Sequence, residues 1–181
     1  MSEPQTTASE AARRFYDALR SSGLSAAALA HGTAYIGQEC LLTPAEITAF
    51  AERAGVTTGT SVLDIGSGTG GPACYLAQQF GCRVLGVDIS TVGHEQAVTR
   101  ARSTGLDHLV QFRCGDIHTI PLPSVAFDVV LSLDAWCHIP QRATLLQRCA
   151  TLLCPGGRIA FYDHVERRPM LEAQRTHFCD L

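Results

Sequence analysis

Glycines alternate with small polar residues in the segment 66–70, which reads GSGTG, and an acidic side chain stands two positions ahead of it. Without Cβ atoms, such a backbone can approach a bound ligand closely and adopt positive φ angles. Asp88 ends a later apolar run and can accept both hydroxyls of a ribose, at about 1.5–3 kcal/mol per charge-assisted bond. These residue types predict a site for a nucleoside-containing ligand. The candidate residues of the loop are Asp64, Gly66, Ser67, Gly68 and Gly70.

Two classes of ligand fit the glycine pattern. Gly66, Gly68 and Gly71 satisfy the GxGxxG spacing of dinucleotide-binding folds, in which a helix N-terminus faces a pyrophosphate. Asp64, however, would repel a diphosphate, whereas it complements the ammonium group of an amino-acid-like ligand. S-adenosylmethionine carries that ammonium and a sulfonium, and it has no phosphate. Charge therefore favours S-adenosylmethionine as the cofactor, with NAD, and hence an oxidoreductase, as the alternative.

Two further side chains are candidates for chemistry on a reacting group. Methyl transfer from a sulfonium needs a positioned nucleophile, and a base where a proton must leave. His138 follows the fourth predicted strand and has the titration range of a general base, with a helix-capping histidine as the alternative. Asp163 ends the fifth predicted strand and could orient a histidine, bind a substrate amine or simply cap the strand. The neighbouring Cys137 is a poor nucleophile partner for His138, because adjacent side chains rarely point at one another.

Apolar runs that alternate with helical segments indicate the elements that must position these residues. The run 61–65 (SVLDI) is typical of a buried parallel strand, and the glycine loop comes directly after it. Strands alternating with helices indicate βαβ units with right-handed crossovers. We therefore expect an α/β fold with a doubly wound, mainly parallel sheet, which binds its ligand at the carboxyl ends of the strands. The expected strands are 61–65, 83–88, 110–114, 127–133 and 158–163, and the expected helices between them are 72–80, 93–103 and 141–153.

A helical segment precedes the sheet. Apolar residues recur at helical spacing over 9–20, and a short helix is expected at 26–30. The segment 43–46 (TPAE) reads as an N-cap, a proline at the first helical position and a capping-box glutamate. We expect two parts: a helical lid over the cofactor, residues 1–55, and a cofactor-binding core, residues 56–181.

The chain resembles the class I S-adenosylmethionine-dependent methyltransferases over residues 41–165. VLDIGSGTGG, VLGVDIS, CGDI and FDVVLSL followed by LLCPGGRIAFYD look like their successive motifs, in order and correctly spaced. YD and HGTAY near the N-terminus resemble stretches of sugar, sarcosine and phosphoethanolamine methyltransferases. The resemblance implies an enzyme that methylates a nitrogen or oxygen atom of a small molecule. It assigns further cofactor contacts to Tyr16, Tyr35, Asp88, Ile89, Asp116, Ile117, Leu133 and His138.

The resemblance also bears on the C-terminal end of the sheet. A complete class I sheet ends in an antiparallel strand pair, and the sequence stops before one. We expect a truncated chain whose fifth strand is an exposed apolar edge, which favours pairing with another molecule, such as a second copy, or covering by a C-terminal helix. A non-catalytic domain that binds S-adenosylmethionine as a partner or regulatory subunit is the alternative to an enzyme.

Composition limits the number of domains and the kinds of partner that this protein can have. The 181 residues include 46% hydrophobic and 17% charged residues, which suits one globular domain. A net charge of −3 and the lack of a basic stripe argue against a nucleic acid or an anionic membrane as partner. The eight cysteines form no CxxC pair, so we expect reduced thiols and no metal site. The N-terminal residues have no apolar signal core, which predicts a cytoplasmic protein.

Overall fold

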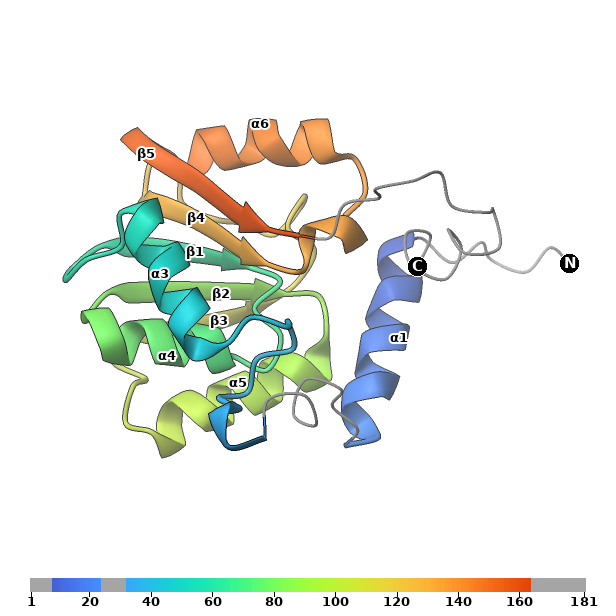
Figure 1. The fold of residues 1–181 in the computed structure, drawn as a ribbon. Helices are drawn as coiled ribbons and strands as arrows, with labels where there is room; N and C mark the ends of the chain where they lie inside the picture. The colour runs from blue at the N-terminus through green and yellow to red at the C-terminus, as the bar shows by residue number, and fades with distance from the viewer. Residues whose placement is uncertain (1–7, 24–31, 164–181) are drawn as a thin grey trace, which may run out of the picture.

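Five parallel strands form one sheet in the order β3-β2-β1-β4-β5 (Figure 1). The computed structural model describes residues 8–23 and 32–163, and the short helix expected at 26–30 lies outside them. The expected doubly wound α/β fold is confirmed. The strands are β1 (Ser61–Ile65), β2 (Arg83–Asp88), β3 (Val110–Cys114), β4 (Phe127–Leu133) and β5 (Leu153–Tyr162).

Helices cover both faces of the sheet, with α3, α4 and α5 on one face and α6 on the other (Figure 1). Successive residues of β1 point to opposite faces, so Val62 packs in the same apolar cluster as Leu76 of α4, while Leu63 packs in the cluster that contains Leu145 of α6. Both faces of β1 are therefore apolar. The helices are α1 (Ala8–Ser21), α3 (Pro44–Ala54), α4 (Gly71–Phe80), α5 (Thr91–Ser103) and α6 (Arg142–Leu152), with 3-10 helices η1 (Gly32–Ala34) and η2 (Trp136–His138).

Strand β1 lies at the centre of the sheet. Leu63 is opposite Leu85 of β2 on one side and Val130 of β4 on the other. From β1 the chain crosses to β2 and β3 on one side, and then to β4 and β5 on the other. The carboxyl end of β1 is therefore the topological switch point, where ligands of open α/β sheets bind. The glycine loop begins there.

Strand β5 is longer than the sequence predicts. The segment 155–157 (PGG) is expected as a turn before a strand at 158, whereas the strand begins at Leu153 and includes this segment. Phe127 is opposite Leu153, but Val129 is opposite Arg158, so the extra residues of β5 form an irregularity in the ladder. The expected turn is absorbed into the strand.

The helix boundaries follow their capping residues. Thr43 Oγ1 accepts a hydrogen bond from the backbone N–H of Glu46, whose carboxylate accepts the Thr43 N–H at 2.8 Å, as the capping box predicts. Gly55 then ends α3 at φ 89°. Helix α5 begins two residues earlier than expected, because Ser90 accepts the Gly93 N–H as its N-cap.

Two findings concern membrane association and cysteine chemistry. Among the described residues, no helix is both long and apolar enough to span a membrane. The seven cysteines in the described part of the chain are free thiols, and Cys179 lies outside it. The cytoplasmic location stays a prediction.

Candidate cofactor and acceptor site

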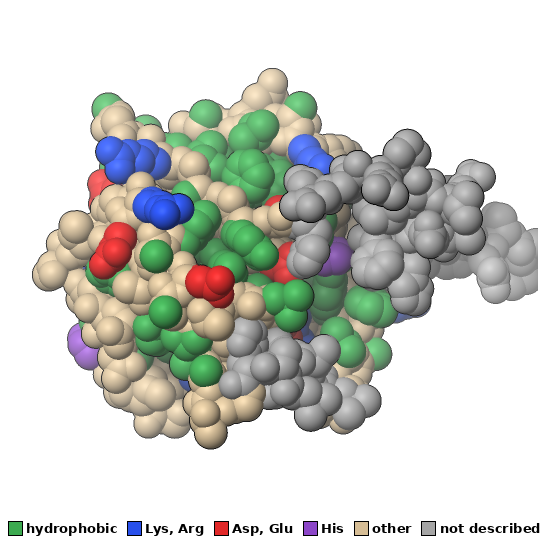
Figure 2. All heavy atoms as spheres, viewed as in Figure 1, with side chains coloured by type: hydrophobic (Ala, Val, Ile, Leu, Met, Phe, Trp, Pro, Cys, Tyr) green, Lys and Arg blue, Asp and Glu red, His purple; other side chains and the backbone are tan. Residues whose placement is uncertain are grey.

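A cavity of about 1190 Å³ opens at the carboxyl ends of β1, β2, β3 and β4. Helix α1 lies across these strand ends, separate from the layers that cover the sheet (Figure 1). Acidic side chains and a histidine are visible among hydrophobic ones on this side of the molecule (Figure 2). The sequence-predicted residues that line the cavity are Tyr16, Tyr35, Asp64, Gly66, Ser67, Gly68, Asp88, Ile89, Asp116, Ile117, Leu133 and His138.

The glycine loop presents bare backbone to this cavity. Gly66 and Gly68 have φ angles of 75° and 53°, in the left-handed region that favours glycine. A Cβ atom at Gly66 would overlap the side chain of Ala135, and one at Gly68 would overlap the carboxylate of Glu39. Gly66 is therefore required by both conformation and space, whereas Gly68 is required by conformation, because the Glu39 side chain can move.

Gly70 has a role in packing. It is the N-cap of α4, and a Cβ atom there would lie 2.6 Å from the ring of Phe112 and 2.8 Å from the Cβ of Ala97. It is not among the described residues that line the cavity. Gly70 therefore lets the loop pack against β3 and α5, and its assignment as a cofactor contact stays a prediction.

Gly71 is explained by packing as well. The carbonyl oxygens of Gly37 and Ile36 lie so close to its Cα that a side chain would overlap them. These two acceptors lie beside the first residue of α4. Carbonyl oxygens there disfavour a pyrophosphate, which argues against the dinucleotide interpretation of Gly66, Gly68 and Gly71.

Asp64 is a buried acid at the head of the loop. Its residue is 2% exposed, and it lines the cavity. Burial, and then the negative charge of Asp88, raise the pKa of its carboxyl to about 7. A positively charged group in the cavity would stabilise its ionised form. The site is therefore electrostatically matched to a cation.

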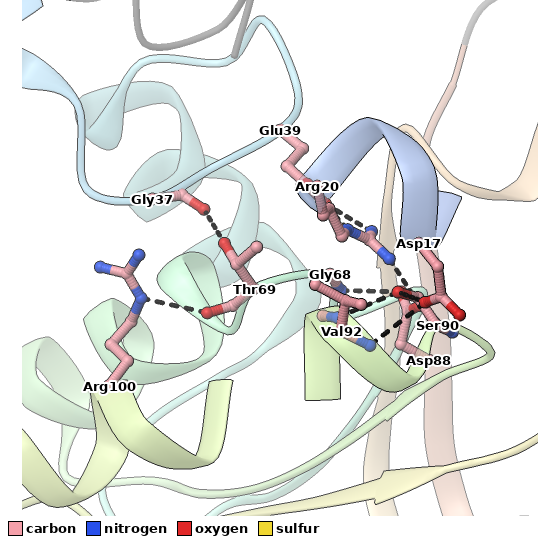
Figure 3. Close-up of polar contacts among 11 residues, drawn as sticks. Asp17, Arg20, Gly37, Glu39, Gly68, Thr69, Asp88, Ser90, Val92 and Arg100 are labelled. Atoms are coloured by element: carbon pink, nitrogen blue, oxygen red, sulfur yellow. Dashed lines mark hydrogen bonds and ion pairs between the residues drawn. The ribbon is translucent and has the colours of Figure 1, made fainter. Parts of the chain in front are cut away.

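The carboxylate of Asp88 is held by three donors at the end of β2 (Figure 3). Oδ2 accepts the backbone N–H of Gly68 at 2.8 Å, and Oδ1 accepts that of Ser90 at 2.9 Å. Arg20 of α1 donates to Oδ1 at 3.0 Å and also forms two bonds with Glu39, at 2.9 and 2.6 Å. Asp88 thus joins the glycine loop, the start of α5 and helix α1.

Helix α1 is anchored at two further points. Asp17 accepts hydrogen bonds from Ser90 Oγ at 2.5 Å, Thr91 Oγ1 at 2.9 Å and the Val92 N–H at 3.1 Å, all at the N-terminus of α5 (Figure 3). Ser9 donates to Oδ2 of Asp116 at 2.6 Å. An acid at a helix N-terminus is favourable, because it pairs with otherwise unsatisfied N–H groups. These contacts fix α1 beside the cavity.

A clamp holds the segment after η1 against the glycine loop. Thr69 Oγ1 donates to the Gly37 carbonyl at 2.9 Å, and Arg100 of α5 donates to the Thr69 carbonyl at 3.0 Å (Figure 3). Arg100 also donates to the carbonyl of Ile36 at 3.3 Å. The segment carries Tyr35 and Glu39, which both line the cavity. Arg100 therefore positions one wall of the site from outside it.

Tyr16 and His138 both line the cavity, and their rings contact each other. Their ring centroids are 5.7 Å apart and their planes are at 74°. Burial, the largest cause, and the nearby Cys137 raise the pKa of the Tyr16 hydroxyl, so it stays protonated at neutral pH. Arg20 lies 5.2 Å from the centroid of the same ring. Tyr16 is therefore a neutral hydroxyl beside an imidazole.

Asp163 contacts Cys137, the residue before His138. It is not among the described residues that line the cavity, whereas Asp134 and Cys137 are. The donor atoms of Asp134, Cys137 and Asp163 lie within 4.8 Å of one another. The pKa of the Cys137 thiol is raised to about 12, mainly by burial. A hydrogen bond to Asp163 and the negative charges of Asp163 and Asp134 raise this pKa further. Asp163 therefore contacts Cys137 without lining the cavity, and its role as a catalytic residue stays a prediction.

Sequence reasoning missed several residues of the cavity. Arg20 lies one turn after Tyr16 on the same face of α1, but helical spacing alone does not reveal its partners Glu39 and Asp88. Ser9 and Asp134 likewise lacked a motif that would single them out. These contacts join residues far apart in sequence, so only the folded chain brings them together.

The fold and the glycine loop define a Rossmann-like domain with a nucleoside site at its switch point. The family described as "Methyltransferase domain" matches residues 63–161. The chain belongs to this family, and its resemblance to class I S-adenosylmethionine-dependent methyltransferases is confirmed.

Individual relatives agree with the family match. Methyltransferase GfsG of Streptomyces halstedii is 38% identical over 64% of this chain and 42% of its own. The glycine/sarcosine/dimethylglycine N-methyltransferase of Actinopolyspora halophila is 34% identical over 70% of this chain and 23% of its own. The chain thus spans less than half the length of these relatives.

A solved structure gives the same comparison in three dimensions. Phosphoethanolamine N-methyltransferase 2 of Haemonchus contortus, in complex with phosphomonomethylethanolamine and S-adenosylhomocysteine, matches with a TM-score of 0.80 at 28% identity. The match covers 97% of this chain and 40% of that protein.

Proposed function

We propose that this chain binds S-adenosylmethionine and transfers its methyl group to a nitrogen or oxygen atom of a small molecule. The observation that carries this proposal is the joint placement of Asp64, Asp88 and the bare backbone of Gly66 and Gly68 in one cavity. Membership of the methyltransferase family and the similarity to individual methyltransferases support it.

The residues of the cavity fit this cofactor. Asp64 is a buried carboxylate that a cation would keep ionised, and the cofactor has an ammonium group and a sulfonium. Asp88 can accept the ribose hydroxyls, and Asp116 lies at the end of the neighbouring strand β3, where an adenine amino group can donate to it. The carbonyl oxygens over Gly71 oppose a diphosphate, which argues against NAD.

The roles of the chain's own residues depend on their positions. When bound, the cofactor supplies a methyl carbon already activated for in-line displacement. We assign to His138 the task of accepting the proton that leaves the attacking nitrogen or oxygen. Tyr16, whose hydroxyl stays protonated, is a donor that orients the acceptor or the cofactor. Asp163 acts through Cys137 as a positioning residue.

The size of the cavity supports a separate acceptor subsite. Pockets for drug-sized ligands occupy about 300–1,000 Å³. The cavity of about 1190 Å³ therefore leaves space beyond the cofactor, beside Tyr16 and His138. Relatives that include the rifamycin methyltransferase of Amycolatopsis mediterranei and the sarcosine enzyme of Halorhodospira halochloris suggest a natural-product or amine acceptor.

Calorimetry tests the cofactor. S-adenosylhomocysteine should bind the chain and NAD should not, and Asp88→Ala should abolish binding while circular dichroism still reports a folded chain. Single-turnover transfer of a labelled methyl group to a mixed panel of amines and phenols tests the reaction. Binding of NAD with no binding of S-adenosylhomocysteine would refute the proposal, and cofactor binding without transfer to any panel member would favour a non-catalytic domain.

The organisation of the chain adds two proposals. The segment 1–55 contains α1, η1 and α3, and α1 and Tyr35 line the cavity, which supports its role as a lid on the core of residues 56–181. Strand β5 pairs only with β4 among the described residues, and Phe161 on it is 51% exposed. We infer self-association through this edge. Light scattering that reports a monomer at all concentrations would contradict it.

A further inference from the structure

Two carboxylates at neighbouring strand ends already accept hydrogen bonds from one helix. Asp116, at the end of β3, accepts the hydroxyl of Ser9 at 2.6 Å. Asp88, at the end of β2, accepts the guanidinium of Arg20 at 3.0 Å (Figure 3). Ser9 and Arg20 stand near the two ends of α1. The helix therefore spans from one carboxylate to the other.

The donors that α1 supplies are of the same kind as those of an adenosine. An adenine amino group and the two ribose hydroxyls are hydrogen-bond donors toward a carboxylate, and so are the serine hydroxyl and the guanidinium. Our proposed function assigns the adenine amino group to Asp116 and the ribose hydroxyls to Asp88. Ser9 and Arg20 thus satisfy the two acids that the cofactor would use.

The Asp88 carboxylate cannot accept hydrogen bonds from both Arg20 and a ribose diol at the same time. An ionised carboxylate offers about four acceptor positions. Gly68, Ser90 and Arg20 already use three of them, and a ribose diol needs two. The Arg20 guanidinium must therefore leave Asp88 before the diol can bind there in full.

Glu39 strengthens this exclusion. It forms two bonds with Arg20, and its carboxylate lies against the bare face of Gly68. The ion pair of Arg20 and Glu39 therefore covers the loop backbone that a cofactor would approach. The side chain of Arg20 is only 6% exposed, so this pair is shielded from water on the Arg20 side.

We propose that helix α1 is a displaceable internal ligand, in which Ser9 and Arg20 occupy the adenine and ribose positions and must be released for the cofactor to bind. This inference rests on the proposed function. Asp17 can still hold α1 on the N-terminus of α5, because its three contacts lie on α5 and the preceding residue rather than on Asp88 or Asp116. Cofactor entry and the release of the Ser9 and Arg20 side chains from Asp116 and Asp88 are then one coupled equilibrium, and these two contacts lower the apparent affinity.

Calorimetry with S-adenosylhomocysteine on the full chain tests this coupling. Arg20→Ala should bind about tenfold more tightly than the unaltered chain, the change that corresponds to one charge-assisted hydrogen bond. Arg20→Lys should lie between them, and Ser9→Ala should give a smaller gain. Arg14→Ala is the matched control, because Arg14 is exposed on the same helix. Unchanged or weaker binding by Arg20→Ala would overturn the inference.

Hydrogen exchange gives a readout that needs no substitution. Added S-adenosylhomocysteine should increase the exchange of amides near Ser9 and near Arg20 in the unaltered chain, because their contacts with Asp116 and Asp88 are lost. Decreased exchange at both places would mean that Ser9 and Arg20 keep their contacts in the complex, which contradicts displacement. If the folded chain and all variants fail to bind S-adenosylhomocysteine, the proposed function itself fails and this inference with it. If the chain binds but Arg20→Ala binds no more tightly, only the inference fails.

Discussion

The ring of Tyr16 lies edge-on to the ring of His138, with 5.7 Å between their centroids. One residue comes from α1 and the other from η2, which lies shortly after β4. A hydroxyl that stays protonated and an imidazole thus border the same end of the cavity. This relationship supports the proposed role of His138 in proton transfer.

His138→Ala should lower kcat by about 10²–10⁴-fold, the usual contribution of a general base. The affinity for S-adenosylhomocysteine should change little, because Asp64 and Asp88 are untouched. Both are measured with the acceptor that the amine and phenol panel identifies, using His108→Ala, an exposed histidine, as the control. A kcat equal to that of the control would remove His138 from the reaction.

The affinity for S-adenosylhomocysteine should rise with pH. Its ammonium group favours the ionised form of Asp64, whose pKa is raised to about 7 in the folded chain. The ionised fraction grows from about 10% at about pH 6 to about 90% at about pH 8, so affinity should increase about ninefold. Calorimetry across this range should give a flat profile for Asp64→Asn. A slope that persists in Asp64→Asn but vanishes in His138→Ala would assign the dependence to the histidine instead.

The same carboxyl should make the free protein less stable as pH rises. Its pKa is raised from 3.8 to about 7, so the folded chain binds more protons than the unfolded chain between these values. Stability from this group is therefore greatest at low pH and is lost as pH rises toward about 7. Asp64→Asn, which carries no charge, should have a higher Tm than the unaltered chain at about pH 8. Identical melting curves of the two at that pH would contradict the burial argument.

Gly70→Ala should destabilise the fold rather than weaken cofactor contacts directly. Its φ of 76° disfavours a side chain by about 1–2 kcal/mol, and overlap with Phe112 and Ala97 should add about 1–3 kcal/mol. Gly59→Ala is the control, since Gly59 has a φ of 80° but no described atom within 4 Å of a Cβ. Urea denaturation should therefore separate the two variants. Equal losses would show that only the backbone conformation matters.

Arg100→Met should loosen the wall of the cavity without touching the cofactor. It removes the bonds to the carbonyls of Thr69 and Ile36 while keeping most of the alkyl chain. The loss of hydrogen bonds from a charged donor should cost about 1.5–3 kcal/mol of unfolding free energy. Limited proteolysis should then cut between residues 32 and 43 faster than in Arg102→Met, an exposed neighbour on α5. Unchanged cleavage would show that the clamp is dispensable.

Local chemistry made much of the fold predictable. The TPAE capping box, the alternation of strands and helices, and the buried run before the glycine loop each depend on residues close in sequence. The structure agrees with them except at boundaries, as at β5, where a three-residue segment that reads as a turn is absorbed into the ladder. The pairing of β5 with β4 decided that boundary, and such pairing exists only in the folded chain.

The site divides in the same way. Asp64, Gly66, Gly68 and Asp88 could be predicted from a motif, because a bare loop at a strand end needs those residue types whatever surrounds it. The packing of Gly70 against Phe112 and the contact of Asp163 with Cys137 could not be predicted in this way, because these neighbours come from other elements.

The sequence by itself therefore determined the sheet, its switch point and the charge of the ligand that suits the loop. Tertiary structure alone decided that Arg20 and Ser9 reach Asp88 and Asp116, and that Tyr16 meets His138. The physical reason is range: dihedral preferences and periodicity act over a few residues, whereas hydrogen bonds and ring contacts join side chains that only folding brings together.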